Sequence, residues 1–400
     1  MTKLRSLIAD IFIIMLSGNI ASAEANTEHK TYSEYSNAAE ETVSASRTSV
    51  NFDYDVSVET KLDNREYDPT PLDFSRTIFG VRGRIGLGVR INQNKITHRI
   101  LAGADPLYEF GGGWKVEPLL YYQMSMPLKR SKLEINAGAF PRVCSRAFYS
   151  EAFFSEADLF YNRSYKGLQF SWTGRRFYYE FGCNWTGQIN AAAPQRREQF
   201  YIYSGGEHRL MTFSKLGYAF VMHHYANSVQ TRGVVDDILA SIYWECNFGS
   251  LIGIQALKSR LGVLQGYQFD RLAMEKASLP TRGEWAFELR NWNVALVNYM
   301  SFGKDLMPLY DRTDASGDIY GSNLYSGDPL TRNNPSEKCG LYDRLGICYE
   351  PNICKGLKLR LQVDVMFNLQ SYMGTRQIIG ISYTLPYFVG SRKNKHNNKE

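Results

Sequence analysis

The sequence of 400 residues predicts an all-β fold: a transmembrane antiparallel β-barrel of about sixteen strands, with roughly 14 to 18 compatible with the pattern. Three observations predict it. Long segments alternate apolar and polar residues, the connections between them alternate between long and short, and the last segment ends in aromatic residues. Membrane barrels place apolar residues toward lipid and polar residues toward the lumen, with long loops at one end and short turns at the other.

The first 47 residues are expected to lie outside the barrel. A basic start, a short apolar run at 7–16 and the small residues Ala21, Ser22 and Ala23 are typical of a secretory signal peptide at 1–23. A polar stretch without periodicity follows, and we interpret it as a flexible leader. The resulting segments are the signal peptide (1–23), the leader (24–47), the barrel (48–388) and a basic periplasmic tail (389–400).

The strands show the alternation directly. In 51–63, the residues from Phe52 to Leu62 on one parity are apolar except Thr60, and those on the other parity are polar. The segments 77–91, 283–290 and 357–367 repeat this pattern, a weaker segment is expected at 251–258, and about sixteen such segments can be counted. Connections such as 103–113, 141–165, 259–282 and 303–339 are long and those such as 92–95 and 173–176 are short. The even count predicts that both termini are periplasmic.

Composition favours a membrane partner over nucleic acid. The chain has 27 Tyr, 22 Phe and 6 Trp, residues whose rings suit the boundary between lipid and water. The net charge of +6 comes largely from the two termini, which argues against a nucleic-acid partner. We expect outer-membrane lipids as partners, and the pattern is compatible with a homo-oligomer.

The six cysteines form no CxxC pair and have no zinc-ligand spacing. A disulfide of Cys339 with Cys348 or Cys354 is conceivable, because export permits disulfides, and the sequence leaves the pairing open.

Charged residues of both signs occupy the polar parity and are expected to line the lumen. They are Arg82, Arg84, Arg90, Glu117, Glu284, Glu288, Arg290, Arg360 and Asp364. Such a lumen suits small polar solutes or ions, so the main hypothesis is a porin-like passive channel without cofactor or catalytic activity. The aromatic-rich connection 141–165 is expected to fold into the barrel and narrow it, with Arg146, Glu151, Glu156 and Asp158 at the constriction.

Two alternatives remain open. "HHYANS" (223–228) faintly resembles the His and Ser segment of outer-membrane lipid hydrolases, which implies a rim hydrolase with His224 as base and Ser228 as nucleophile. The third hypothesis is a structural or adhesive barrel with a blocked lumen. Asp311, Asp314 and Asp318 offer oxygen ligands for a cation, but their spacing lacks the D-x-D-x-D-G pattern and favours a solvated loop without metal.

The last strand carries a resemblance to a known group of proteins. "GISYTLPYF" (380–388) resembles the C-terminal β-signal of Gram-negative outer-membrane proteins, although Ile378 stands where a polar residue is usual and a basic tail follows. The span 48–388 resembles porin-like outer-membrane barrels of an uncharacterised subfamily. This resemblance implies an outer-membrane location and recognition by the barrel-insertion machinery through Gly380, Tyr383, Leu385 and Phe388.

Overall fold

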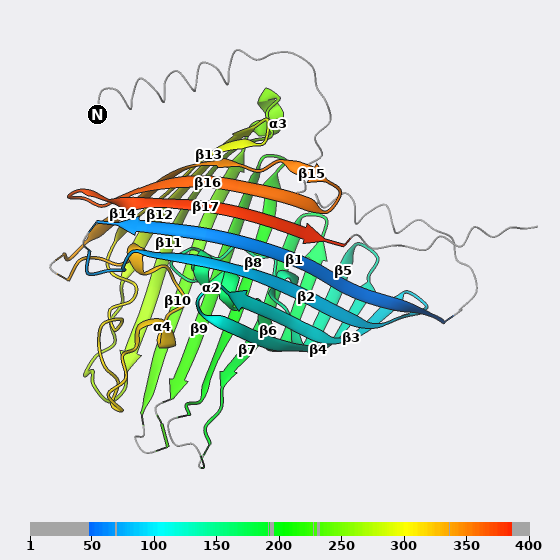
Figure 1. The fold of residues 1–400 in the computed structure, drawn as a ribbon, viewed down its shortest axis with the longest axis horizontal. Helices are drawn as coiled ribbons and strands as arrows, with labels where there is room; N and C mark the ends of the chain where they lie inside the picture. The colour runs from blue at the N-terminus through cyan, green and yellow to red at the C-terminus, as the bar shows by residue number, and fades with distance from the viewer. Residues whose placement is uncertain are drawn as a thin grey trace, which may run out of the picture.

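The chain folds into one closed antiparallel barrel (Figure 1). The computed structural model describes residues 48–68, 70–190, 192, 196–226, 228–229, 233–335 and 337–385. Of its 17 strands, β15 (Asn352–Cys354) pairs only with β16, within the connection from β14 to β16, so that 16 strands form the wall. The barrel closes where β1 (Ser49–Tyr67) pairs with β17 (Tyr372–Thr384). This confirms the predicted fold class.

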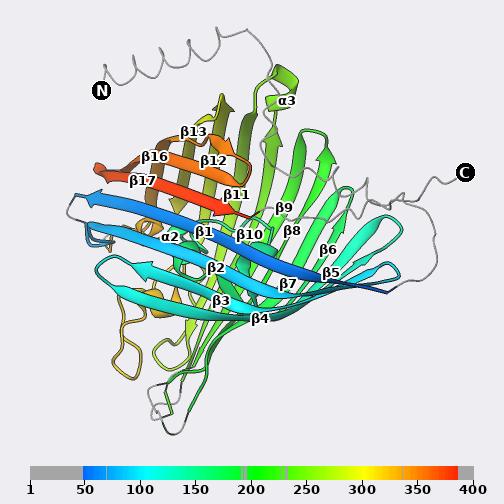
Figure 2. The ribbon, with the colours of Figure 1, turned by 45° about the vertical axis from the view of Figure 1, so that its right-hand side comes forward.

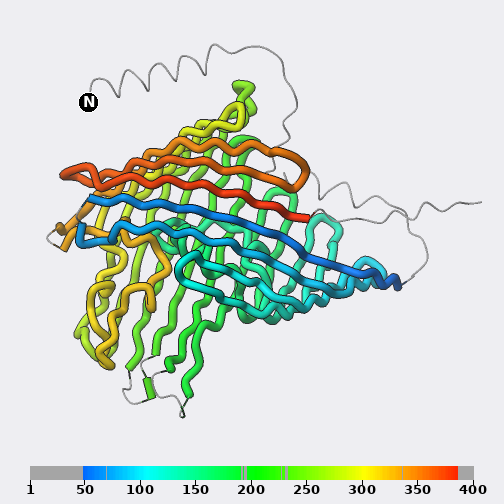
Figure 3. The backbone as a smooth tube through the Cα atoms, viewed as in Figure 1, coloured from blue at the N-terminus to red at the C-terminus, as the bar shows by residue number. Residues whose placement is uncertain are grey.

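The other wall strands follow one another around the barrel in chain order. They are β2 (Arg76–Gln93), β3 (Ile96–Glu109), β4 (Gly113–Pro127), β5 (Ser131–Pro141), β6 (Ser164–Gly174), β7 (Phe177–Gly187), β8 (Gln199–Met211), β9 (Ser214–Ala226), β10 (Val234–Asn247), β11 (Ala256–Asp270), β12 (Thr281–Asn291), β13 (Val294–Gly303), β14 (Gly340–Tyr349) and β16 (Leu357–Phe367). Figure 3 shows how strongly these strands tilt as they wrap around the barrel.

The helical segments are short and lie in connections. They are η2 (Arg142–Cys144), α2 (Glu156–Tyr161), α3 (Gly249–Ile252), α4 (Gly321–Leu324) and η3 (Pro329–Thr331). Among the described residues, no helix has the length and apolar character needed to cross a bilayer.

The two faces of the wall follow the predicted parity. Phe52 on β1 is 70% exposed on the outer face, whereas its neighbour Asp53 is 1% exposed on the inner face. Exposed apolar side chains recur on the outer face of the other strands, as on Leu87, Trp244 and Val363. An apolar outer face and a polar inner face are what a bilayer requires of a spanning sheet.

Successive connections alternate between the two ends of the barrel. We call the end with the connections 142–163 and 304–339 the long-loop end, and the end with turns such as 94–95 and 175–176 the short-turn end. The prediction of a long connection at 103–113 is wrong, because Ala104 and Leu107 continue β3 up to a tight turn at 110–112.

The strand expected at 251–258 is also wrong. This stretch holds the end of α3 and the first residues of β11, which then continues to Asp270 through the range expected to be a loop. The outer parity of β11 carries Leu261, Val263 and Tyr267, but Gly262 and Gly266 on its inner parity hide the alternation. The connection that follows is therefore only 271–280.

The largest buried apolar cluster lies inside the barrel. The connection 142–163, which we call the plug, enters the lumen from the long-loop end, and α2 is seen within the ring of strands (Figure 2). Phe153 and Phe154 of the plug pack on wall residues Phe140, Tyr165 and Tyr203, all nearly inaccessible to solvent. The connection 304–339, which we call the cap, packs a second cluster including Met307, Tyr320 and Tyr325 against Tyr225 and Val235.

Candidate functional site

The plug is bonded to the wall on one side through Glu180 of β7. The carboxylate of Glu180 accepts hydrogen bonds from the Ser145 hydroxyl at 2.5 Å, the Arg146 backbone N–H at 2.8 Å and the Tyr149 hydroxyl at 2.9 Å. On another strand, the Arg82 guanidinium donates to the Phe160 carbonyl at 2.5 Å. Charge-assisted bonds of this kind are roughly twice as strong as neutral ones. The start and the end of the plug are therefore both held inside the lumen.

The centre of the plug is held through Glu156, which pairs with three cations of β1, β16 and β17, the strands that form the barrel seam. Glu156 lies 2.8 Å from Arg376 of β17, 2.8 Å from Arg360 of β16 and 3.4 Å from Lys61 of β1. These cations hold the pKa of the Glu156 carboxyl well below its usual range, although burial alone would raise it. One plug carboxylate thus joins the first and last strands of the barrel.

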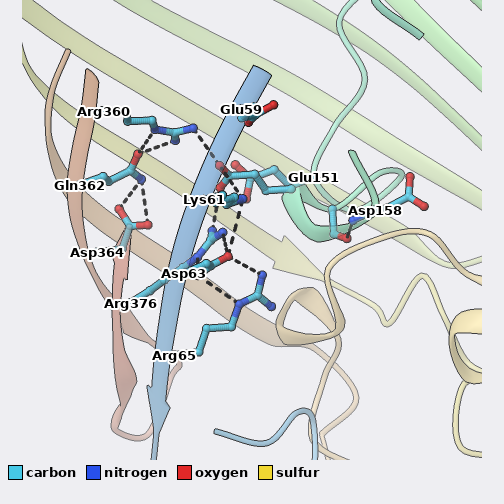
Figure 4. Close-up of polar contacts among 12 residues, drawn as sticks. Glu59, Lys61, Asp63, Arg65, Glu151, Asp158, Arg360, Gln362, Asp364 and Arg376 are labelled. Atoms are coloured by element: carbon cyan, nitrogen blue, oxygen red, sulfur yellow. Dashed lines mark hydrogen bonds and ion pairs between the residues drawn. The ribbon is translucent and has the colours of Figure 1, made fainter. Parts of the chain in front are cut away.

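The seam network continues beyond Glu156. Asp63 pairs with Arg376 at 2.5 Å and with Arg65 at 3.0 Å, and Asp364 accepts from Gln362 at 2.7 Å (Figure 4). Removing one partner from such a buried network leaves an uncompensated charge. The plug carboxylate is therefore expected to stabilise the barrel seam while the plug is docked.

Glu151 gives the plug a titratable contact. It pairs with Arg344 of β14, yet burial, together with the charges of Asp328 and Glu156, raises the pKa of its carboxyl to about 7. Because this pKa lies above that of a free Glu, protonated Glu151 favours the docked plug. The stabilisation is complete below about pH 4.5 and is lost as the pH rises through about 7.

We expect the plug to dock less tightly at pH 8 than at pH 5.5, and Glu151→Gln to remove most of this difference. Cys144 reports docking, because burial raises the pKa of its thiol to about 12 and makes it unreactive in the docked plug. Maleimide labelling of Cys144, read by peptide mass spectrometry, should be several-fold faster at pH 8 in the wild type than in the variant. Equal rates in the two proteins at both pH values would contradict this role of Glu151.

The predicted lumen residues all lie on the inner parity of their strands. Arg82 and Arg84 pair with Asp105, Arg90 with Asp53, Arg290 with Glu288 and Glu350, and Glu288 also with Lys258. Glu117 lies 3.7 Å from Arg82, Glu284 accepts from Ser150, and Arg360 and Asp364 belong to the seam network. Of the plug candidates, Asp158 pairs with Arg142 and Arg146 with Glu134. A cavity of about 180 Å³, lined by residues including Phe148, Arg260 and Tyr299, lies beside these contacts, between the plug and the inner face of β10–β14.

The structure does not bring His224 and Ser228 together. His224 stacks on Phe200 on the outer face, with ring centroids 4.8 Å apart. Ser228 is buried and lies 3.3 Å from the Ser316 hydroxyl of the cap. Neighbouring residues of a strand point to opposite faces, so His223 points into the barrel instead.

His223 is paired with a carboxylate on the inner wall, an arrangement that is common in enzyme active sites. Its Nδ1 lies 2.8 Å from Oδ2 of Asp237 on β10, and its Nε2 is buried without a hydrogen-bond partner among the described residues. Asp237 in turn accepts a bond from the Gln268 amide on β11, and Gln268 accepts one from the Tyr325 hydroxyl of the cap at 2.8 Å. A carboxylate on Nδ1 fixes the tautomer that leaves Nε2 as a base.

The sequence contains a signal for this pair in the parity and register of the β9–β10 hairpin. His223 and Asp237 are both on the inner parity and are paired across the β9–β10 hairpin. The neighbouring hydroxyl of Ser228 drew attention to His224 instead. Assigning the hairpin register would have placed His223 opposite Asp237.

The cap covers this pair from the long-loop end. Tyr320 donates to Asp270 at 2.6 Å, and Tyr225 donates to Asp314 at 3.0 Å. Asp314 also pairs with Arg197, and Asp311 with Arg332. Asp311, Asp314 and Asp318 therefore form ion pairs with arginine side chains of the protein itself. Within the described ranges, no group of three or more His, Cys, Asp or Glu side chains is placed to hold a metal.

The cysteines are not joined. All six are free thiols, with Cys339 and Cys354 exposed and Cys348 buried. Cys339 and Cys348 lie at opposite ends of β14, and a disulfide requires Cα atoms within about 7 Å.

A sequence profile of the lipid A 3'-O-deacylase-type family matches residues 44–392. The chain belongs to this family. Its membership contradicts the prediction that the protein is not an enzyme, because the family is named for an enzymatic activity. No curated protein matches the sequence.

Solved barrels share the fold at low identity. A loop L8 deletion mutant of OmpT, an outer membrane protein of Vibrio cholerae, is 11% identical, with a TM-score of 0.50 over 84% of this chain and 99% of that one. Pseudomonas aeruginosa OpdO is also 11% identical, with a TM-score of 0.47 over 84% and 97% of the two chains. The chain has the fold of a Gram-negative outer-membrane barrel.

The predicted signal peptide, leader and basic tail lie outside the described residues, as does Phe388. Gly380, Tyr383 and Leu385 are described at the end of β17, where Gly380 pairs with Lys61 and Tyr383 with Val58. Recognition by the insertion machinery stays a prediction.

Proposed function

We propose that the protein hydrolyses an ester-linked acyl chain of a lipid A-like glycolipid, with His223 as general base. The observation that carries the proposal is the family match over residues 44–392. The buried pair of His223 and Asp237 supplies the chemistry such a reaction needs, because a general base accelerates ester hydrolysis by taking a proton from the attacking water molecule.

In the proposed reaction, Nε2 of His223 removes a proton from a water molecule as its oxygen attacks the ester carbonyl carbon. The resulting tetrahedral intermediate collapses when the bond to the sugar oxygen breaks. The imidazolium returns its proton to that oxygen, releasing a fatty acid and the free sugar hydroxyl. Asp237 stabilises the imidazolium while the proton is held, and Gln268 and Tyr325 orient Asp237.

The position of the site suits a lipid substrate that enters from the long-loop end. His223 lies three residues before the end of β9 at that rim, and Asp237 lies three residues after the start of β10. We place the long-loop end outside the cell, where long barrel loops are usual. The cap tyrosines cover the pair, so the proposal includes movement of residues 304–339 when substrate binds.

Passive transport is a weaker second candidate. The mixed charges around the cavity between the plug and β10–β14 favour polar solutes. The plug, however, crosses the lumen and is bonded to β2, β7 and the seam strands. These contacts weigh against free passage in this state.

The test is incubation of the purified full chain with lipid A in mixed detergent micelles. Fatty acid release above that of heat-inactivated protein is expected. A control variant that carries both His223→Ala and Asp237→Asn should release no more fatty acid than the heat-inactivated protein. Absence of release from the folded wild type, in micelles and in reconstituted bilayers, would contradict the proposal.

A further inference from the structure

The short-turn end carries an uneven charge distribution around its rim. Lys129 and Arg130 lie in the turn from β4 to β5, and Arg175 and Arg176 in the turn from β6 to β7. All four side chains are exposed, and none forms an ion pair with any described residue. Neither turn contains an acidic residue.

Strand pairing makes these turns one continuous surface. Ser131 pairs with Gly174, which places the two turns side by side, and Phe177 pairs with His208, which adds the end of β8. The backbone N–H of Arg209 donates to the Arg176 carbonyl at 2.6 Å, so a fifth basic residue adjoins the group. We call Lys129, Arg130, Arg175, Arg176 and Arg209 the basic rim.

The opposite half of the same end lacks this charge. The connections 248–255 and 292–293 contain no charged residue, and 350–356 contains one acid, Glu350, and one base, Lys355. The basic rim is therefore not a general property of the short turns.

The basic rim borders the apolar outer face directly. Leu128 and Trp172 are each 46% exposed, and the rings of Trp172 and Phe177 pack edge to face with centroids 4.6 Å apart. Aromatic rings next to cations are typical of the level at which lipid headgroups begin. A partner on this surface would meet exposed apolar side chains together with the four exposed cations of the two turns. A phospholipid matches the apolar side chains with its tails and the cations with its phosphate.

We propose that the basic rim binds the phosphate groups of anionic phospholipids in the leaflet at the short-turn end. Clusters of Lys and Arg at a bilayer surface attract anionic lipids, and the attraction weakens with salt. The binding orders lipid on one side of the barrel only, and it does not depend on the reaction proposed for His223.

The test is native mass spectrometry of the full chain with added phosphatidylglycerol or phosphatidylcholine. The variant K129Q/R130Q/R175Q/R176Q removes the four exposed, unpaired cations of the basic rim. The control K276Q/K304Q/R312Q/K338Q removes four exposed cations at the long-loop end, giving the same change in net charge. A third variant, R130K/R175K/R176K, keeps the charge. Heat-dependent gel mobility confirms that each barrel is folded.

The wild type, the long-loop control and the lysine variant should prefer phosphatidylglycerol, with a preference that falls as salt rises. In the glutamine variant of the basic rim, the preference for phosphatidylglycerol over phosphatidylcholine should fall by roughly tenfold or more. Equal preference in this variant and the wild type would overturn the proposal, as would an equal loss in the long-loop control. Binding of soluble polyglutamate without any preference among lipids would overturn it in favour of an acidic protein partner.

Discussion

Replacing His223 by alanine is expected to lower the rate of acyl-chain release by about 10²–10⁴-fold, the usual contribution of a general base. The protein offers a control in the next residue, because His224 lies on the outer face against Phe200. His224→Ala should leave the rate within about twofold of the wild type. Fatty acid release per mole of folded barrel measures both.

Asp237→Asn separates a positioning role from general destabilisation. The asparagine keeps the size of the side chain but no longer favours the tautomer in which Nδ1 carries the proton. We expect a fall in rate without a change in heat-dependent mobility, whereas Ser228→Ala should have little effect. If His223→Ala retained wild-type turnover while Ser228→Ala abolished it, the assignment of the base and the site would be wrong.

Deleting residues 146–160 is expected to raise single-channel conductance in planar bilayers severalfold or more. The deletion removes Glu156, Phe153 and Phe154 and joins the cavity of about 180 Å³ to the rest of the lumen. Water would then solvate Arg360 and Arg376, which lose their plug partner. A sixteen-stranded barrel without a plug is wide enough for an aqueous channel.

The milder variant Glu156→Gln keeps the plug but weakens its hold on the seam. It should produce intermittent openings rather than a permanently larger conductance. Unchanged conductance after the deletion, in a barrel that still shows heat-dependent mobility, would place the block of the lumen elsewhere.

Most of the fold could be predicted because a bilayer requires apolar and polar side chains to alternate, with a period of two residues, along every spanning strand. Segments such as 357–367, with Leu or Val on one parity and Lys, Arg or Asp on the other, admit few alternatives. The errors fell where this contrast is weak. Gly262 and Gly266 obscure the alternation of β11, and Gly103 and Pro106 obscure the continuation of β3 to Glu109, although consecutive glycines mark the turn that follows.

The site was harder to predict because its contacts join residues distant in sequence. The aromatic content of 141–165 indicated that this connection folds inward, but not that Glu156 meets Lys61, Arg360 and Arg376. The local pattern "HHYANS" suggested a nucleophile four residues after a histidine. β9 ends at Ala226, so Ser228 lies in the connection beyond it, where its hydroxyl contacts Ser316 of the cap and not His224.

The most direct test of the account is the mass and position of the acyl chain lost from lipid A in cells. Cells that produce the wild-type protein should contain lipid A lacking the 3'-O-linked chain, as the family description implies. Cells with equal amounts of folded His223→Ala protein should contain the intact form. Intact lipid A in both, or loss of the chain in both, would contradict hydrolysis by the pair of His223 and Asp237.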